Sequence, residues 1–115
     1  MTSSIEALSD GTAILVLSGE IDLATAPKMV ARFQELADKG LTNVVIDARE
    51  VRFIDSTGLH GLVEGKRLIY EKGSTIILVP SRQVRRVLEI IFPDPLFAAR
   101  VESMDEALAM LDIKS

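Results

Sequence analysis

The stretch VRFIDSTGLHG, residues 51–61, decides the fold of this chain, because a strand-like apolar run ends in it and a helix pattern begins. The run VRFI is followed by Asp55, by two hydroxyl residues and by Gly58. Acidic and hydroxyl side chains often cap a helix, since they accept hydrogen bonds from its first free N–H groups. Ser56 and Thr57 are therefore either helix caps or carriers of chemistry.

Strand-like and helix-like segments alternate on both sides of this stretch. Short apolar runs rich in β-branched residues predict strands at 12–17, 43–48 and 75–79. Helical periodicity predicts four helices. The first runs from Pro27 to a cap at Gly40, and the second runs from Ser56 to Lys72, with a stop at Gly73. The third begins after Pro80 and Ser81, and the fourth follows the capping box of Ser103 and Glu106. The prolines of 92–97 predict a connection, with Phe92 and Phe97 in the core.

This alternation predicts an α/β fold. Strand–helix–strand units imply right-handed crossovers and parallel strands, with the ligand edge at the strand C-termini. We expect one domain over residues 1–115, a layered structure with a mainly parallel, mixed sheet of about four to five strands and about four helices.

Acidic residues follow several of the predicted strands, at the edge where ligands bind in such folds. Glu20 and Asp22 follow the first of these strands, Asp47 ends the next, and Asp55 with Ser56 occupies a strand-to-helix junction. For Asp47 we prefer a capping role. For Asp22 and Ser56 we expect a functional role.

The helix that follows Ser56 has three distinct faces when its residues are placed at about 100° intervals. Its core face is predicted to hold Leu59, Leu62, Val63, Ile69 and Tyr70. The opposite side is predicted to be a solvent-facing polar stripe of Ser56, His60, Glu64 and Arg67. Gly58, Gly61 and Gly65 share a third arc, which indicates close approach of another segment. We expect helix-to-sheet packing at Gly65, and either that packing or a partner chain at Gly58.

Composition excludes several classes of function. The 115 residues include no cysteine and one histidine, which excludes disulfides and a Cys/His zinc site. With 17 acidic and 13 basic residues, the net charge of −4 has the wrong sign for direct nucleic-acid binding. Apolar runs are too short to cross a membrane, and no signal segment is visible. We expect a soluble cytoplasmic protein that binds no membrane, metal or cofactor.

Catalytic constellations do not fit the residues around Ser56. His60 lies one turn from Ser56, but Asp55 is next to the serine and cannot orient the imidazole, so a serine hydrolase is not indicated. The run Gly61 to Lys66 is too short for a phosphate-binding loop. What remains is an acceptor serine at a helix N-terminus, where the N–H groups and the helix dipole favour a phosphate. We therefore expect no enzymatic activity.

Three stretches resemble the STAS-domain anti-sigma-factor antagonists of bacteria: GEIDLATAP at 19–27, FIDSTGL at 53–59, and VPSRQVRRVLEI at 79–90. With the order of the predicted elements, the resemblance covers nearly the whole chain and implies the STAS fold. It implies that an unphosphorylated antagonist binds an anti-sigma factor and so releases a sigma factor. That anti-sigma factor is itself a serine kinase, and a metal-dependent serine phosphatase of the PP2C type reverses the phosphorylation.

The same resemblance assigns roles to individual residues. Ser56 matches the phosphorylated serine, and Asp22 matches a loop acid near it. Asp55, Thr57 and Gly58 belong to the matched motif and are predicted, with Asp22 and Ser56, to contact the partner. His60 stands where the family commonly has a small residue, on the surface expected to meet the kinase.

Two other classes of protein remain as alternatives. A scaffold component of a stress-signalling complex would use the same domain. A receiver domain phosphorylated on aspartate has similar length and alternation, with Glu20 and Asp22 as its acidic pair and Asp47 as its phosphoacceptor. A receiver also requires a lysine at the end of a later strand, where this chain has Val79 and Pro80.

Overall fold

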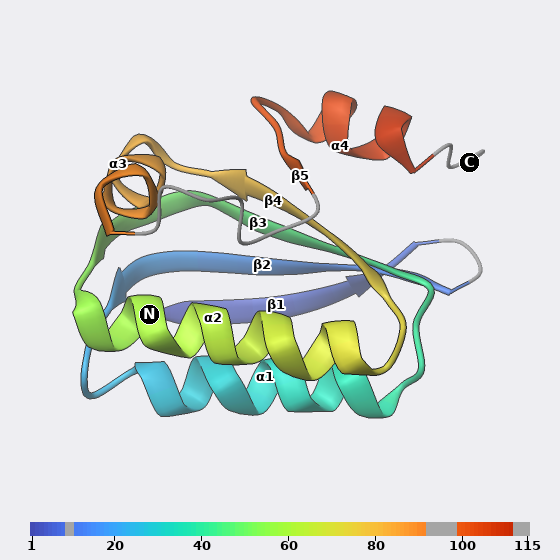
Figure 1. Cartoon of the computed structure of the whole chain (residues 1–115), viewed down its shortest axis with the longest axis horizontal. Coiled ribbons are helices and arrows are strands. Elements are labelled where there is room, and N and C mark those ends of the chain that lie inside the picture. Colours follow the sequence, from blue (N-terminus) through green and yellow to red (C-terminus); the bar gives the residue numbers. More distant parts are fainter. Residues whose placement is uncertain (9–10, 92–98, 112–115) are drawn as a thin grey trace.

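Five strands form one mixed sheet in the computed structural model of the chain, which describes residues 1–8, 11–91 and 99–111 (Figure 1). The strands are β1 (Thr2–Ala7), β2 (Thr12–Ile21), β3 (Asn43–Ile54), β4 (Thr75–Pro80) and β5 (Ala99–Arg100). They lie in the order β1-β2-β3-β4-β5. The edge strand β1 pairs antiparallel with β2, and each of the other neighbouring pairs is parallel. This sheet confirms the predicted α/β class and the mainly parallel, mixed topology.

Helices cover both faces of the sheet. The described helices are α1 (Ala26–Asp38), α2 (Ser56–Glu71), α3 (Arg82–Ile91) and α4 (Met104–Met110). Figure 1 shows α1 and α2 side by side below the sheet, α4 on the opposite side, and α3 beyond the end of β4. Both α1 and α2 begin at the same end of the molecule, on the left of that view. Whatever precedes these two helices is therefore brought to one edge.

Alternation of side chains along the central strands divides the core in two. The larger cluster lies between the sheet and α1 and α2, and includes Leu15, Phe33, Ile46 and Leu62. A smaller cluster on the opposite face includes Ile14, Val45, Ile77, Val79, Val101 and Ala107. Strands buried on both faces have continuous apolar runs, which is why the segments NVVI and TIILV predict strands correctly.

The pairing of β2 with β3 contains two irregularities. At one end of the pair Thr12 lies opposite Asn43, and at the other end Ile21 lies opposite Ile54. The register shifts between Val16 and Ser18, and again between Gly19 and Glu20. The 10 residues of β2 thus match 12 residues of β3. A bulge of this kind bends a strand and redirects its side chains. Here it lets the two strands end together.

Most of the predicted helix boundaries are confirmed. Gly40 and Gly73 have positive φ values of 64° and 88°, as expected for glycines that end helices. Ser81 accepts a hydrogen bond from the Val84 N–H, and Ser103 accepts one from the Glu106 N–H.

The prediction that Tyr70 belongs to the core is wrong. Its side chain is 66% exposed. The ring packs under the ammonium group of Lys66, with Nζ 4.9 Å from the ring centroid. Phe92 and Phe97, which were predicted to lie in the core, fall outside the described residues.

Candidate functional site

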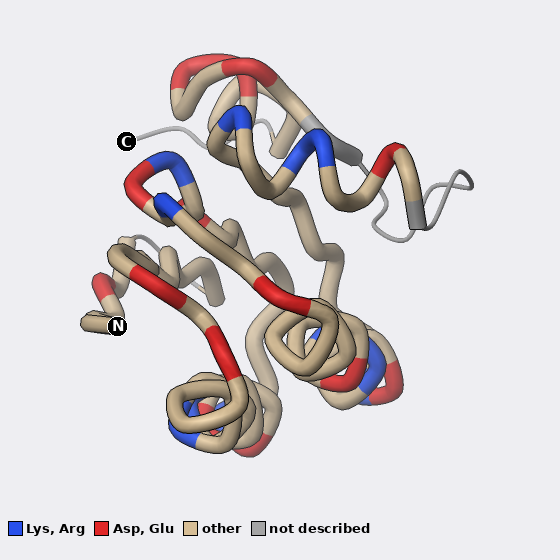
Figure 2. The backbone as a smooth tube through the Cα atoms, turned by 90° about the vertical axis from the view of Figure 1, so that its left-hand side faces the viewer, with Lys and Arg blue, Asp and Glu red and all other residues tan. Residues whose placement is uncertain are grey.

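Two loops meet at the end of the molecule where α1 and α2 begin. Ile21 ends β2, Ile54 ends β3, and these residues pair across the sheet. The Asp55 N–H donates a 3.1 Å hydrogen bond to the Ile21 carbonyl oxygen, which fixes the second loop against the first. Figure 2 looks onto this end, where the chain segments entering α1 and α2 both carry acidic residues. The loop that starts at Asp22 and the junction 55–58 are thus neighbours.

Asp55, and not Ser56, caps α2. Its carboxylate accepts a 2.8 Å hydrogen bond from the Gly58 N–H, and its carbonyl oxygen accepts one from the Leu59 N–H. Ser56 is the first residue of the helix, and it is exposed. Of the two roles considered for Ser56, capping is therefore wrong. Within the described part of the chain, no hydrogen bond engages its hydroxyl group, which leaves that group available to solvent.

Gly58 allows the first turn of α2 to lie against the end of β2. A Cβ atom at this position would lie 2.6 Å from the Ile21 carbonyl oxygen and 2.9 Å from the Ile54 side chain. A backbone oxygen cannot rotate away, so only glycine fits without movement. The close approach at Gly58 is thus made by this chain, and Gly58 is buried. Contact of Gly58 with a partner stays a prediction, as it does for the half-buried Thr57 next to it.

Asp22 organises the turn that leads into α1. Its Oδ1 accepts hydrogen bonds from the Ala24 N–H at 3.0 Å, the Thr25 N–H at 3.1 Å and the Thr25 hydroxyl at 3.1 Å. In return, the Thr25 hydroxyl oxygen accepts a 2.9 Å hydrogen bond from the Asp22 N–H. The bonds from the Thr25 side chain and N–H lower the pKa of Asp22. Asp22 is therefore an ionised turn former, and it lies next in sequence to Ile21, which holds Asp55.

The polar stripe predicted on α2 is confirmed. Ser56, His60 and Arg67 are exposed and Glu64 is half-buried, all on the side away from the core residues Leu59, Leu62 and Ile69.

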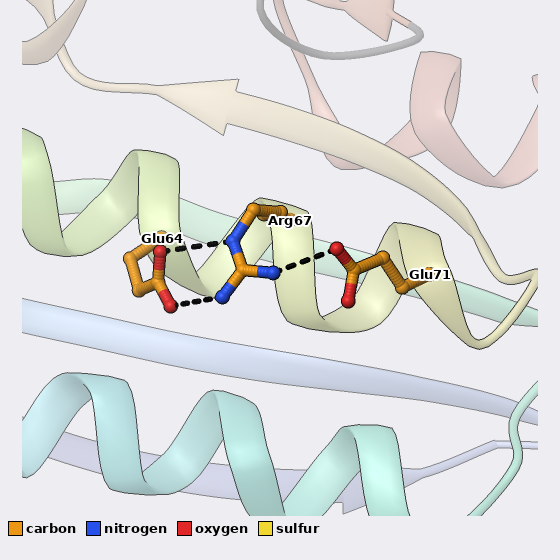
Figure 3. Close-up of polar contacts among 3 residues, drawn as sticks. All are labelled: Glu64, Arg67 and Glu71. Carbon is orange, nitrogen blue, oxygen red and sulfur yellow. Dashed lines mark hydrogen bonds and ion pairs between the residues drawn. The ribbon is translucent and has the colours of Figure 1, made fainter.

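Ion pairs occupy the far end of this stripe. Figure 3 shows Arg67 between two acids: its Nε lies 3.0 Å from Glu64 Oε2, and its Nη1 lies 2.6 Å from Glu71 Oε1. These bonds raise the pKa of Arg67, and the bonds from Arg67 lower the pKa of Glu64. The stripe therefore begins with an uncharged hydroxyl group and ends in a closed set of ion pairs.

Asp47 does not cap a helix, and the prediction that it does is wrong. It is a buried residue inside β3, between Val16 of β2 and Val79 of β4. Burial alone would raise the pKa of Asp47, but hydrogen bonds from Arg49 at 2.8 and 2.9 Å lower it below its usual value. Asp47 is thus a structural ion-pair residue.

The position of Asp47 also argues against a receiver domain. Asp47 precedes Ile54 by seven residues of strand, a length of about 20 Å, whereas Asp22 lies level with the end of that strand. An acidic pair at Glu20 and Asp22 is therefore far from the proposed phosphoacceptor.

Two exposed apolar side chains near the site were not identified from the sequence. Leu23 is 73% exposed in the loop after Asp22, and Phe53 is 45% exposed two residues before Asp55. Leu23 could have been found, because it is a large apolar residue in a turn between polar ones and outside any periodic pattern. Phe53 could not, because the bulges change the face to which the end of β3 presents each side chain.

Two further findings concern the described residues 1–8, 11–91 and 99–111 as a whole. They contain no group of three or more His, Asp or Glu side chains that could hold a metal ion. Their helices are all too short or too polar to span a bilayer.

Comparison with known proteins identifies the family. The model of the STAS domain matches residues 6–107. The chain is 33% identical over 90 residues to the Bordetella bronchiseptica protein named "Putative anti-sigma factor antagonist BtrV", a match that covers 73% of this chain and 78% of that protein.

Solved structures share the whole fold. An anti-sigma factor antagonist from Mycobacterium paratuberculosis has a TM-score of 0.80 and 26% identity, over 97% of this chain and 94% of that one. The Bacillus protein SpoIIAA in its phosphorylated form has a TM-score of 0.72 and 20% identity, over 96% of this chain and 99% of that one. The chain therefore belongs to the STAS domain family, among relatives that are anti-sigma factor antagonists.

Proposed function

We propose that this chain is an anti-sigma factor antagonist controlled by phosphorylation of Ser56. In the unphosphorylated state it binds an anti-sigma factor, and the sigma factor is released. The anti-sigma factor is also a serine kinase that modifies Ser56 and thereby ends the complex. A phosphatase of the PP2C type returns Ser56 to its free form. The observation that carries this proposal is the exposed Ser56 hydroxyl at the start of α2, where Asp55 performs the capping.

The start of α2 suits a phosphate group for two reasons. A helix N-terminus carries a partial positive charge and free N–H groups, both of which stabilise an anion. Since Asp55 accepts hydrogen bonds from the Gly58 and Leu59 N–H groups, those of Ser56 and Thr57 remain at the helix start. A phosphate on Ser56 can thus be held without any change in the core residues beneath it.

The reaction is a transfer between two oxygen atoms. The Ser56 hydroxyl oxygen attacks the γ-phosphorus of ATP, the bond from that phosphorus to the bridging oxygen breaks, and ADP leaves. The hydroxyl proton passes to a base of the kinase or to the phosphate itself. Asp22 supports the step from the neighbouring loop, by orienting the hydroxyl group or by contacting the kinase.

Binding and release depend on charge at a covered surface. Leu23 and Phe53 supply exposed apolar surface near the junction 55–58, which a partner can bury. A phosphate within such an interface costs about 2–5 kcal/mol, or roughly a 30-fold to several-thousand-fold loss of affinity. The phosphorylated chain keeps its fold and loses its partner. SpoIIAA has the same fold and has been solved in both unphosphorylated and phosphorylated forms.

The test compares Ser56→Glu and Ser56→Ala in calorimetric titrations against the cognate anti-sigma factor. Ser56→Glu is expected to keep the circular dichroism spectrum and cooperative melting, and to bind at least about 30-fold more weakly. Ser56→Ala is expected to bind and to resist phosphorylation.

The matched control is Thr75→Glu, which adds the same charge at an exposed hydroxyl residue where β4 begins. It is expected to bind like the wild type. Tight binding by Ser56→Glu, or phosphate mapped to Thr57 in the wild type, would refute the proposal.

A further inference from the structure

His60 lies one helical turn after Ser56 on the polar stripe of α2. Both residues are exposed, and they face away from the core. Residues four apart on a helix have Cβ atoms about 5–6 Å apart, a distance that a phosphoserine and an imidazole side chain easily span. His60 is the single histidine of the 115-residue chain. The stripe thus places the one imidazole of the protein within reach of the serine hydroxyl.

We propose that His60, as an imidazolium, binds the phosphate of phosphorylated Ser56. This inference rests on the proposed function, since it concerns the modified state of that site. A dianionic phosphate favours the protonated imidazole beside it, and the imidazolium favours the dianion in return. His60 therefore offsets part of the negative charge that the modified site presents to a partner.

The charged groups around His60 leave few other candidates for this role. On α2 itself, Asp55 and Glu64 are acidic, and Arg67 is held between Glu64 and Glu71 (Figure 3). Lys66 packs over the Tyr70 ring. These cations are thus engaged elsewhere on the helix.

Neighbouring elements contribute mainly apolar or acidic groups. The residues of α1 nearest to Gly61 are apolar, namely Ala26, Met29 and Val30. The loop before α1 brings Asp22, which is acidic and engaged with Thr25. On α3, Arg85 pairs with Glu102 at 2.9 Å, and Arg82 and Arg86 are exposed. Arg82, the first residue of α3, serves as the control cation outside α2.

The experiment measures the phosphate directly by ³¹P NMR. Phosphoserine is inserted at position 56 during translation, so that no kinase is needed, and the chain is titrated from about pH 5 to pH 8, around the second pKa of phosphoserine near 6. In His60→Gln this second pKa is expected to rise by about 0.3 unit, a twofold change in proton affinity, because the neighbouring cation is lost. His60→Lys, which restores a positive charge, is expected to bring it back.

Two control variants each remove one positive charge elsewhere, Lys66→Gln on the same helix and Arg82→Gln on α3. Both are expected to change the phosphate pKa by less than about 0.1 unit, since distant surface charges are screened. As a second measurement, the ¹⁵N signals of the single imidazole are expected to shift when Ser56 is phosphorylated. A phosphate pKa unchanged in His60→Gln, or one that moves more in Arg82→Gln, would overturn the assignment.

The outcomes separate this inference from the proposed function. If no kinase modifies Ser56 and Ser56→Glu binds tightly, the proposed function fails, whatever the phosphate titration gives. If the titration shows no effect of His60, the inference fails while the switch at Ser56 stands.

Discussion

Replacing Gly65 with alanine is expected to destabilise the chain by about 1–2 kcal/mol, because the new methyl group would overlap the ring of Phe33. An ideal Cβ at Gly65 would lie 2.1 Å from Phe33 Cδ2 and 2.3 Å from Cγ. Ordinary carbon contacts are about 3.5–4.0 Å, so the ring or the helix must move by more than about 1 Å. Gly65 therefore serves the contact between α2 and α1, and the predicted contact with the sheet is wrong.

The magnitude follows from two opposing contributions. Phe33 is fully buried in the larger core cluster, so its ring has no free space to enter, and overpacking of this kind costs about 2–3 kcal/mol. Alanine in place of glycine returns about 0.5–1 kcal/mol through its better helix propensity. Urea unfolding followed by circular dichroism should show a midpoint lower by roughly 1 M, if the slope is about 1.5 kcal/mol per molar.

The matched control is Gly61→Ala, the same substitution one turn earlier on the same helix. Its Cβ would meet the flexible end of Met29, with Cε at 3.0 Å, which can move aside. It is expected to be neutral within about 0.5 kcal/mol. Phe33→Leu should relieve part of the cost of Gly65→Ala, which a double-mutant cycle detects as non-additivity. If Gly65→Ala is as stable as the wild type, or less damaging than Gly61→Ala, the steric reasoning is refuted.

Two further predictions concern acidic residues. Asp22→Asn is expected to keep the melting temperature, because the amide oxygen can accept the same hydrogen bonds from Ala24 and Thr25. The variant is also expected to be phosphorylated more slowly than the wild type. A normal rate in a kinase assay would limit Asp22 to a turn-forming role. Because the folded state lowers the pKa of Asp47, the pair with Arg49 stabilises the fold above the unfolded pKa, about 3.9, and this stabilisation is lost as pH falls through the lower folded value. Arg49→Gln should therefore lower the free energy of unfolding by about 0.5–1 kcal/mol at pH 7, and by little near pH 3. The figure at pH 7 is reduced because the arginine side chain is half exposed to solvent. An equal loss at both pH values would contradict this prediction.

The parts of the fold that could be predicted from the sequence are those with strong periodicity or end signals. The predicted strands 12–17, 43–48 and 75–79 lie within β2, β3 and β4, because buried parallel strands are apolar throughout. The start of α2 at Ser56 follows from the change of pattern within residues 51–61.

The missed parts depend on tertiary contacts. The strand β1 (TSSIEA) is an edge strand with one face in solvent, and Ile5 is its one large apolar residue. A single apolar residue gives no periodic signal. The last residues of β2 were missed, and the strand 43–48 and the strand-like run 51–54 belong to the single strand β3, because bulges break the alternation there. Asp55 caps α2 and Ser56 does not, a difference of one residue in where the helix starts. Helix propensities do not resolve a difference of that size. That Ser56 is phosphorylated and that its neighbours contact a partner stay predictions.

The two extra residues of β3 have a consequence for how this protein can change during evolution. They bring the end of β3 level with the end of β2, so that the Asp55 N–H reaches the Ile21 carbonyl oxygen. Substitutions between Asp47 and Ile54 leave this reach intact, because it depends on the backbone. Insertion or deletion of a residue would displace the end of β3, and Ser56 after it, by about 3.3 Å and turn the strand residues that follow toward the opposite face. Relatives that share the site should therefore vary in composition across this segment while its length is kept.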